Sequence, residues 1–200
     1  MNTTSLRIRK AIANDAQAIL DIYQYYRANT AISLNPATPS LLDCENLITS
    51  TLSTYPFLIA EADEQVVGFT YCKPYKADSA FAWSVETRIY VERDALKQGI
   101  GSALHNALEQ ACKAQGICNL YLCITYSAEI DKYRNATSLV FHENMGYRKE
   151  GEFENCGYKN GHWFSQYWMQ KNINRHKSDP EPITPFEQLT KEQLAACGIS

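Results

Sequence analysis

The stretch Lys97–Leu104, KQGIGSAL, has two glycines separated by one isoleucine, and it lies between a strand-like segment and a helix-like segment. Glycine lets the backbone turn sharply and approach a ligand closely, because it has no Cβ atom. The first N–H groups of the following helix have no partner within the helix and point outward at its positive end. Such a junction can bind a phosphate, with Lys97 adding a positive charge nearby. A tight turn into a helix, without a ligand, is the simpler interpretation of these residues alone.

Two common phosphate-binding motifs do not fit this stretch. A P-loop requires a lysine and a hydroxyl residue directly after its second glycine, whereas Gly101 is followed by Ser102 and Ala103. A dinucleotide-binding motif requires a third glycine near Leu104 and a position early in the chain.

Strand-like and helix-like patterns alternate along most of the chain. The predicted strands are residues 6–9, 57–62, 65–75, 81–91, 118–125, 147–155 and 162–173. The predicted helices are residues 13–29, 36–52, 102–116, 135–146 and a short one within 189–198. Asn14 and Thr38 are the predicted caps of the first two helices, and Gly116 is the predicted end of the third. Asp63–Gln65 should join two strands as a hairpin. This order predicts an α/β protein built on one sheet.

The chain of 200 residues is long enough for one domain and a tail. After Ile173 the sequence becomes polar and rich in proline. We therefore predict a domain at residues 1–173, followed by a polar linker and short C-terminal tail at residues 174–200.

The composition excludes several classes of protein. A net charge of -3 argues against general nucleic-acid binding, and no apolar run approaches the length of a membrane span. The N-terminus has no apolar segment of the kind found in signal peptides, so a cytoplasmic protein is expected. The seven cysteines form no CxxC pair and are expected to be reduced core thiols. The four histidines are isolated from other ligand residues, so no metal site is expected.

At the glycine stretch the chain resembles the GNAT superfamily of acyl-CoA N-acyltransferases. Their motif is a strand, then Arg/Gln-x-x-Gly-x-Gly/Ala, then a helix, and here it is LKQGIG, with Leu96 in place of the polar first residue. A second GNAT signature is similar to NATSLVFHENMGY at residues 135–147. The resemblance implies a GNAT fold, with a mixed sheet splayed near its middle and helices on its faces. It also implies that the glycine loop holds the pyrophosphate of coenzyme A.

The segments YPFLIAE, FAWSVETRIYV and GYKNGHWFSQYWMQ resemble the phosphinothricin N-acetyltransferase branch of that superfamily. The similarity covers about residues 5–173. It implies direct transfer of an acetyl group from acetyl-CoA to a small amino-acid-like amine, of the phosphinothricin or methionine sulfoximine type, in a ternary complex. A homodimer is expected from the family alone.

Two alternatives stay open. One is an acetyltransferase for a different amine, such as a polyamine, an aminoglycoside-like compound or a protein N-terminus. The other is a CoA-binding module without catalysis. Turnover of acetyl-CoA with a panel of amines separates them.

Glu86 is the candidate general base. It lies in the strand before the glycines, among apolar residues that include Val85 and Ile89. Apolar surroundings favour the neutral form of a carboxylic acid, which can then exchange a proton near neutral pH. The alternative is a carboxylate at the rim of the sheet that pairs with Arg88, two residues further on the same strand face. The resemblance places Glu86 at the position of the general base.

His142 is the second candidate. A single histidine in a short helix is usually a structural residue with its hydrogen bonds satisfied. The resemblance implies a role in proton transfer, at the position where most GNAT enzymes have a tyrosine that protonates the departing thiolate.

The resemblance also implies binding residues. Those expected near acetyl-CoA are Ile89, Tyr90 and Val91 through backbone amides at the oxyanion, Lys97, Gln98, Gly99, Ile100, Gly101 and Ser102 at the pyrophosphate, and Asn135 and Ser138 near the pantetheine arm. Those expected near the acceptor are Asp78, Phe81, Trp83 and Arg88. Asp78 lies at or beside a position where the branch usually has an arginine, so poor use of phosphinothricin is expected.

Overall fold

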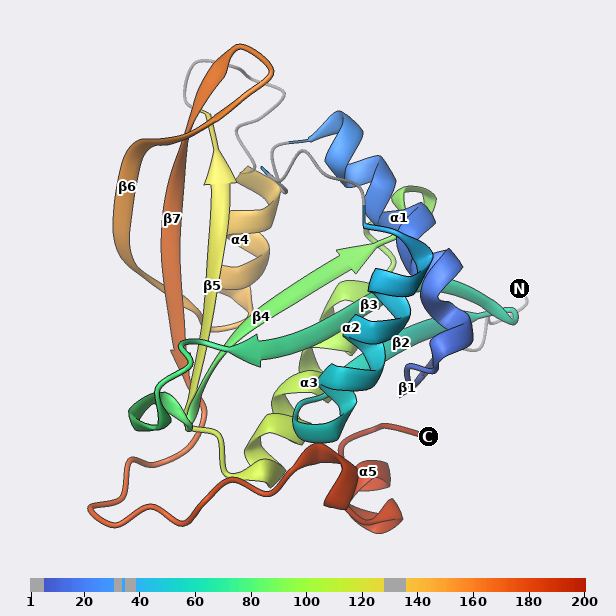
Figure 1. Cartoon of the computed structure of the whole chain (residues 1–200), viewed down its shortest axis with the longest axis vertical. Coiled ribbons are helices and arrows are strands. Elements are labelled where there is room, and N and C mark those ends of the chain that lie inside the picture. The colour runs from blue at the N-terminus through green and yellow to red at the C-terminus, as the bar shows by residue number, and fades with distance from the viewer. Residues whose placement is uncertain (1–5, 31–33, 35–38, 128–135) are drawn as a thin grey trace. The chain divides into compact units, whose positions relative to one another are not determined.

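The computed structural model describes residues 6–30, 34, 39–127 and 136–200 of the chain. Its strands are β1 (Arg7–Lys10), β2 (Phe57–Ala62), β3 (Gln65–Pro74), β4 (Ser84–Val91), β5 (Asn119–Tyr126), β6 (Arg148–Lys159) and β7 (His162–Asn172). Its helices are α1 (Ala16–Asn29), α2 (Leu41–Thr54), α3 (Ile100–Gln115), α4 (Ala136–Asn144) and α5 (Lys191–Ala196). Within these residues the strands form one mixed sheet of seven strands in the order β1-β2-β3-β4-β5-β7-β6, which confirms the predicted α/β class (Figure 1). The splay expected near its middle stays a prediction.

The chain divides into two compact units. The first contains residues 1–22, 39–120 and 172–200, and the second contains residues 23–38 and 121–171. This division does not correspond to the predicted boundary at residue 173 between a domain and a tail, which stays a prediction.

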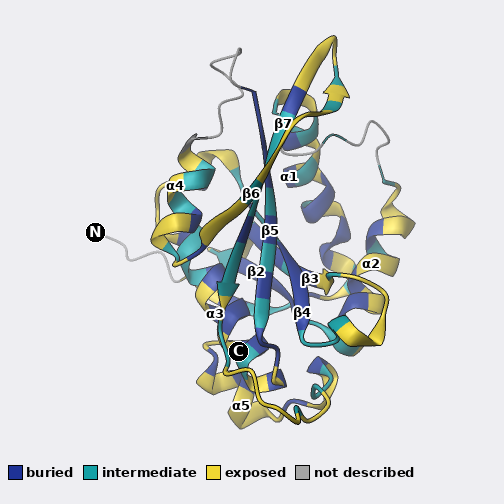
Figure 2. Ribbon diagram, turned by 90° about the vertical axis from the view of Figure 1, so that its left-hand side faces the viewer, coloured by how far each residue is buried: buried dark blue, intermediate teal, exposed yellow. Residues whose placement is uncertain are grey.

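In the first unit, neighbouring strands from β1 to β4 run antiparallel. The even-numbered positions of β3 face α3, because a Cβ atom at Gly68 would lie 3.1 Å from the Leu104 side chain. Side chains alternate along a strand, so Phe69, Tyr71 and Lys73 point to the opposite face. Figure 1 shows α2 in front of β2 and β3 and α3 behind them. Most of β2 and β4 is buried between these layers (Figure 2).

Two local features of the first unit follow from the sequence as predicted. Asp63 and Glu64 have positive φ angles of 49° and 64° in the turn from β2 to β3. Turns with positive φ fit the twist of a hairpin, so the predicted hairpin is confirmed. Gly116 has a φ angle of 89° and caps the end of α3, as predicted.

The predicted N-terminal caps were wrong. Helix α1 begins at Ala16 after a 3₁₀ turn at Ala13–Asp15, so Asn14 is not its cap. Helix α2 begins at Leu41, and its cap is Ser40, whose hydroxyl accepts a hydrogen bond from the backbone N–H of Asp43 at 3.1 Å. The predicted cap of α2, Thr38, lies outside the described residues. Ser40 is the cap because the Asp43 side chain accepts a hydrogen bond from the Ser40 N–H in return, which completes a capping box.

The C-terminal segment packs within the first unit. A 3₁₀ turn at Phe186–Gln188 buries the Phe186 ring completely, and the predicted short helix is confirmed as α5. The backbone N–H of Ser200 donates to the Ile8 carbonyl at 3.0 Å, next to strand β1. Apolar residues spaced widely in this polar segment therefore anchor it to the core.

In the second unit, β6 and β7 form an antiparallel hairpin. Its turn contains Asn160 and Gly161, with φ angles of 51° and 83°. Strand β6 continues to Lys159, beyond the predicted end at residue 155, with register shifts at two places along it. The Lys159 ammonium donates to the carbonyl oxygens of Arg27 at 2.8 Å and Thr30 at 3.3 Å, which ties this hairpin to the end of α1.

Candidate active site

The glycine stretch forms a tight turn into α3. A 3₁₀ turn at Arg93–Ala95 follows β4, and Lys97 has a φ angle of 63°. Gly99 is the N-terminal cap of α3 with a φ angle of 83°, a left-handed conformation that favours glycine. A Cβ atom at Gly99 would meet nothing within 4 Å, so this glycine is required for its φ angle and not for space.

The start of α3 has the geometry of an anion site. The first bond of the helix runs from the N–H of Ala103 to the carbonyl of Gly99 at 3.0 Å. The N–H groups of Ile100, Gly101 and Ser102 therefore have no acceptor one turn earlier within the helix. Gly101 is the second residue of α3, so the helix begins at Ile100, two residues before the predicted start at Ser102. The first glycine makes the turn, and the second lies in the first helical turn.

Glu86 lies in β4, and it is buried, with 6% of the residue exposed. Its carboxylate forms an ion pair with the Lys73 ammonium at 2.9 Å and a second one with the Arg88 guanidinium. Lys73 stands directly opposite Glu86 in the β3–β4 register, so both side chains leave the same face of the sheet. The expected apolar surroundings were therefore wrong, because two cations contact the carboxylate.

The pairing of Glu86 with Arg88, considered as the alternative to catalysis, is confirmed. This pairing does not by itself exclude a base, since a carboxylate can accept a proton from a group positioned beside it. Sequence reasoning missed Lys73. The signal that could have identified Lys73 was the register between β3 and β4. That register places Lys73 opposite Glu86, although the two residues are thirteen positions apart in the sequence.

His142 lies in α4 of the second unit and is buried, with 7% of the residue exposed. Its Nδ1 atom lies 2.8 Å from the carbonyl oxygen of Ser138. The rings of Phe141 and Tyr147 lie edge-on to the imidazole, with centroids at 4.9 Å and 5.6 Å. Burial lowers the pKa of His142 to about 4, although the hydrogen bond to Ser138 opposes this.

The hydrogen bond fixes which nitrogen of His142 carries the proton. A carbonyl oxygen only accepts, so the Ser138 contact assigns the proton of the neutral ring to Nδ1. The other nitrogen, Nε2, is then an acceptor. Donation of a proton from Nε2 to a thiolate would require the imidazolium form, which burial disfavours at neutral pH.

The comparisons with known proteins agree with this geometry. The profile of the acetyltransferase (GNAT) domain matches residues 8–168. The chain belongs to the GNAT acetyltransferase family. The predicted family is thereby confirmed, and with it the prediction of an acetyl-CoA-dependent N-acetyltransferase.

Two relatives of this GNAT enzyme have names that state their substrates. The phosphinothricin N-acetyltransferase of Streptomyces viridochromogenes is 31% identical, over 92% of this chain and 96% of its own length. An L-methionine sulfoximine/L-methionine sulfone acetyltransferase of Pseudomonas aeruginosa is 29% identical, over 88% of this chain and 99% of its own. The predicted resemblance to the phosphinothricin N-acetyltransferase branch is confirmed.

Solved structures of other proteins share the fold of this GNAT enzyme. A phosphinothricin acetyltransferase from Sinorhizobium meliloti, solved in complex with acetyl-CoA, superimposes with a TM-score of 0.78 at 23% identity. The match covers 90% of this chain and 98% of that one. At this identity the likeness supports the fold.

Of the residues expected near the acceptor, Arg88 is the one that the described contacts bring to Glu86. Asp78 is exposed and precedes a 3₁₀ turn at Ser79–Phe81. The Phe81 ring meets the Tyr75 ring edge-on at 5.8 Å, on the segment between β3 and β4. None of the described contacts joins Asp78 or Phe81 to Glu86, and their role at the acceptor stays a prediction.

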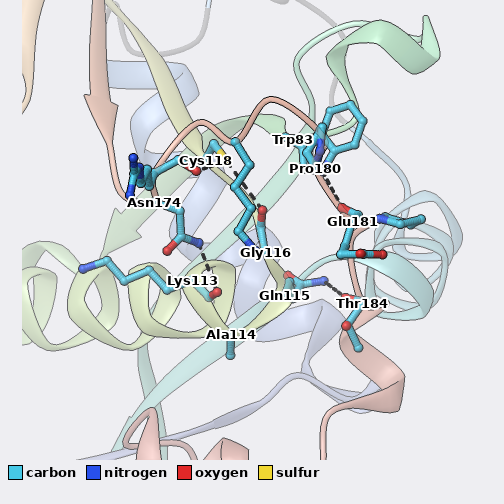
Figure 3. A pocket seen from close by; sticks show the side chains of 13 residues that line it. Trp83, Lys113, Ala114, Gln115, Gly116, Cys118, Asn174, Pro180, Glu181 and Thr184 are labelled. Carbon is cyan, nitrogen blue, oxygen red and sulfur yellow. Dashed lines mark hydrogen bonds between the residues drawn. The ribbon is translucent and has the colours of Figure 1, made fainter.

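The indole of Trp83 faces a different part of the first unit. Its Nε1 atom donates to the carbonyl oxygen of Glu181 at 2.8 Å. The Trp83 side chain also lines a pocket of about 390 Å³ at the C-terminal end of α3 (Figure 3). Gln115 lines the same pocket and donates to the Thr184 carbonyl at 2.9 Å. The C-terminal segment forms one wall of this pocket, whose position could not be predicted from the sequence.

The remaining predicted residues near acetyl-CoA lie as follows. Ile89, Tyr90 and Val91 form the end of β4, opposite Thr70, Phe69 and Gly68 of β3. Ser138 is half-buried in α4, and Asn135 lies outside the described residues.

Across the described ranges, no cluster of three or more His, Cys, Asp or Glu side chains is placed to hold a metal ion. In the same part of the chain, no helix combines the length and the apolar character that crossing a membrane requires.

Proposed function

We propose that this enzyme transfers the acetyl group of acetyl-CoA to the α-amine of a small amino-acid-like acceptor of the phosphinothricin or methionine sulfoximine type. The observation that carries the proposal is a buried carboxylate, Glu86, on the strand that leads to the glycine turn, where it pairs with Lys73 and Arg88. The substrates named for the Streptomyces and Pseudomonas relatives support the acceptor class.

In the proposed reaction, Glu86 takes one proton from the acceptor ammonium. The free amine then attacks the thioester carbonyl, a carbon–nitrogen bond forms, and the carbon–sulfur bond breaks. The balance is R–NH₃⁺ plus acetyl-CoA to the acetamide, coenzyme A thiol and one proton. No covalent enzyme intermediate is needed, because binding both substrates in one complex supplies the rate advantage.

Coenzyme A is proposed to bind through its pyrophosphate at Gln98–Ser102, where Lys97 adds a positive charge. Backbone amides of Ile89, Tyr90 and Val91 are proposed for the oxyanion, and Asn135 and Ser138 for the pantetheine arm. The geometry of the α3 N-terminus supports the first assignment.

The setting of the reaction is part of the proposal. The enzyme is proposed to work in the cytoplasm as a homodimer, without a metal ion and without nucleic acid or membrane as a partner. The net charge of -3 and the absence of CxxC pairs support this setting.

Thiol release from acetyl-CoA tests the proposed function. The assay compares methionine sulfoximine, methionine sulfone, phosphinothricin, common amino acids and spermidine as acceptors. We expect the highest kcat/KM with an α-amino acid. Preference for spermidine would support a different acetyltransferase, and coenzyme A binding without thiol release from any amine would support a non-catalytic module.

A further inference from the structure

The ion pairs of Glu86 present a problem for a general base. When the carboxylate takes a proton it loses its charge, and both ion pairs with Lys73 and Arg88 are weakened at the same time. The loss of these two charged contacts therefore opposes the proton transfer that the reaction requires. An acceptor that draws these cations away from Glu86 would remove this opposition.

The exposure of the three side chains shows how an acceptor would reach them. About half of the Lys73 side chain is exposed (47%), and 30% of the Arg88 side chain is exposed, whereas 8% of the Glu86 side chain is. The two cations that contact the carboxylate are thus more exposed to solvent than the carboxylate itself, and Lys73 stands on the same face of the sheet as Glu86. An anionic group that approaches this face meets the cations before it meets Glu86.

We propose that Lys73 and Arg88 bind the carboxylate of the acceptor, and that this binding frees Glu86 to take the proton of the acceptor ammonium. The proposal rests on the proposed function, and it identifies the carboxylate as the group that selects the substrate. An α-amino acid carries its carboxylate and its ammonium on one carbon atom. Two cations beside one carboxylate match that pattern of charges, and a guanidinium can hold a carboxylate through two parallel hydrogen bonds.

The proposal makes the acceptor carboxylate necessary for rate as well as for affinity. A polyamine brings only positive charge to this face, so Lys73 and Arg88 repel it and stay on Glu86. The carboxamide of an amino acid keeps the amine in place but has no charge with which to draw the cations away. Both kinds of amine should therefore show a lower kcat in addition to a higher KM.

The test compares methionine sulfone with its carboxamide as acceptors, by thiol release at saturating acetyl-CoA. For the wild-type enzyme we expect the acid to have a kcat/KM about 100-fold higher than the amide, with part of the difference in kcat. In Lys73→Met and Arg88→Met, kcat/KM for the acid should fall by about 10- to 100-fold, while the value for the amide stays constant or rises. The ratio of acid to amide should thus collapse.

The chain offers a matched control. Lys113 pairs with Glu109 of α3 at 2.7 Å and is also partly exposed, but this pair lies on the helix and not at Glu86. Lys113→Met removes the same charge and should leave the ratio of acid to amide unchanged. Lys73→Arg and Arg88→Lys keep the charge and should retain most of the preference, which separates a binding role from a loss of folding.

The outcomes distinguish the two proposals. Equal use of acid and amide by the wild-type enzyme would overturn the role of the carboxylate and leave the proposed acetyltransferase intact. Equal losses with both acceptors in Lys73→Met and Arg88→Met would also overturn it. If no amine releases thiol from acetyl-CoA, the proposed function itself fails.

Discussion

Glu86 in the first unit and His142 in the second are buried to nearly the same extent, with 6% and 7% of each residue exposed. Their surroundings are opposite. Two cations contact the carboxylate of Glu86, whereas aromatic rings and one backbone carbonyl surround the imidazole of His142, and burial lowers the pKa of that imidazole. Burial alone thus does not decide the charge of a group, because the partners that contact it also contribute.

The comparison assigns the two residues different tasks. The carboxylate of Glu86 is proposed to accept a proton from an ammonium once the acceptor has drawn Lys73 and Arg88 away from it. The neutral imidazole has its one proton engaged at Nδ1, so we predict that it is a poor proton donor at neutral pH. Four experiments test this contrast, and they are given in order of decreasing expected effect.

Replacing Glu86 should have the largest effect. Glu86→Gln keeps the shape of the side chain and removes the base, so kcat should fall by about 10²–10⁴-fold, the usual contribution of general-base catalysis. Steady-state thiol release with methionine sulfoximine measures it. Glu109 is a matched control, since it is buried to the same 6% and also pairs with a lysine, so Glu109→Gln should leave kcat unchanged. A loss below threefold in Glu86→Gln would rule out Glu86 as the base.

Because His142 is held neutral in the folded protein, the free energy of unfolding should decrease at acidic pH. Its pKa is about 4 in the folded protein and about 6.5 in the unfolded chain, so between these values the unfolded chain binds a proton that the folded protein does not. The contribution of His142 is therefore fully present above pH 6.5 and is lost as the pH falls toward 4, by about 3 kcal/mol at most.

Urea unfolding at pH 7 and at pH 4.5 measures this loss. His142→Gln should lose clearly less stability than the wild-type protein over the same interval. His162 is exposed in the same unit, so His162→Gln should behave as the wild type does. Identical pH dependence in His142→Gln and the wild type would mean that the imidazole is not held neutral.

The α3 N-terminus should respond to an added negative charge. Gly101→Glu places a side chain and a charge where the pyrophosphate is proposed to bind, so KM for acetyl-CoA should rise by about 10- to 100-fold with little change in the fold. Ala114→Glu adds the same charge at the other, exposed end of α3 and should leave KM unchanged. An unaltered KM in a folded Gly101→Glu protein would refute the proposed pyrophosphate site.

The smallest effect is expected from His142→Phe. This variant keeps the aromatic packing and removes both nitrogens, and because the neutral ring does not donate a proton, kcat should fall by less than about 10-fold. KM for acetyl-CoA should change little. A fall as large as that of Glu86→Gln would show that His142 transfers a proton in the rate-limiting step.

The features that the sequence predicted well are those with local signals. The glycine turn and the end of α3 at Gly116 depend on single residues with unusual φ angles, and the β2–β3 hairpin depends on a short polar turn. The position of Glu86 also came from the sequence. Its surroundings did not, because the cation opposite it, Lys73, is set by the β3–β4 register.

The C-terminal segment shows the same limit. Its polar, proline-rich composition predicted a linker, and its fixed position depends on bonds to residues far away in the sequence. The Thr184 N–H donates to the Gln115 carbonyl at 2.8 Å, and Asn174 donates to the carbonyl oxygens of Lys113 and Ile117. Composition carries no information about such partners, of which the Glu181 carbonyl that accepts from the Trp83 indole is another. The position of Trp83 near the acceptor, which the resemblance implies, stays a prediction.

The most direct test of the account is a single-turnover measurement of the chemical step. Enzyme saturated with acetyl-CoA is mixed rapidly with methionine sulfoximine and quenched, and the acetylated product is quantified for the wild type and for Glu86→Gln. The account predicts that the rate constant of acetyl transfer falls at least about 100-fold in Glu86→Gln, while the acceptor still binds. Equal rate constants in the two proteins would contradict it.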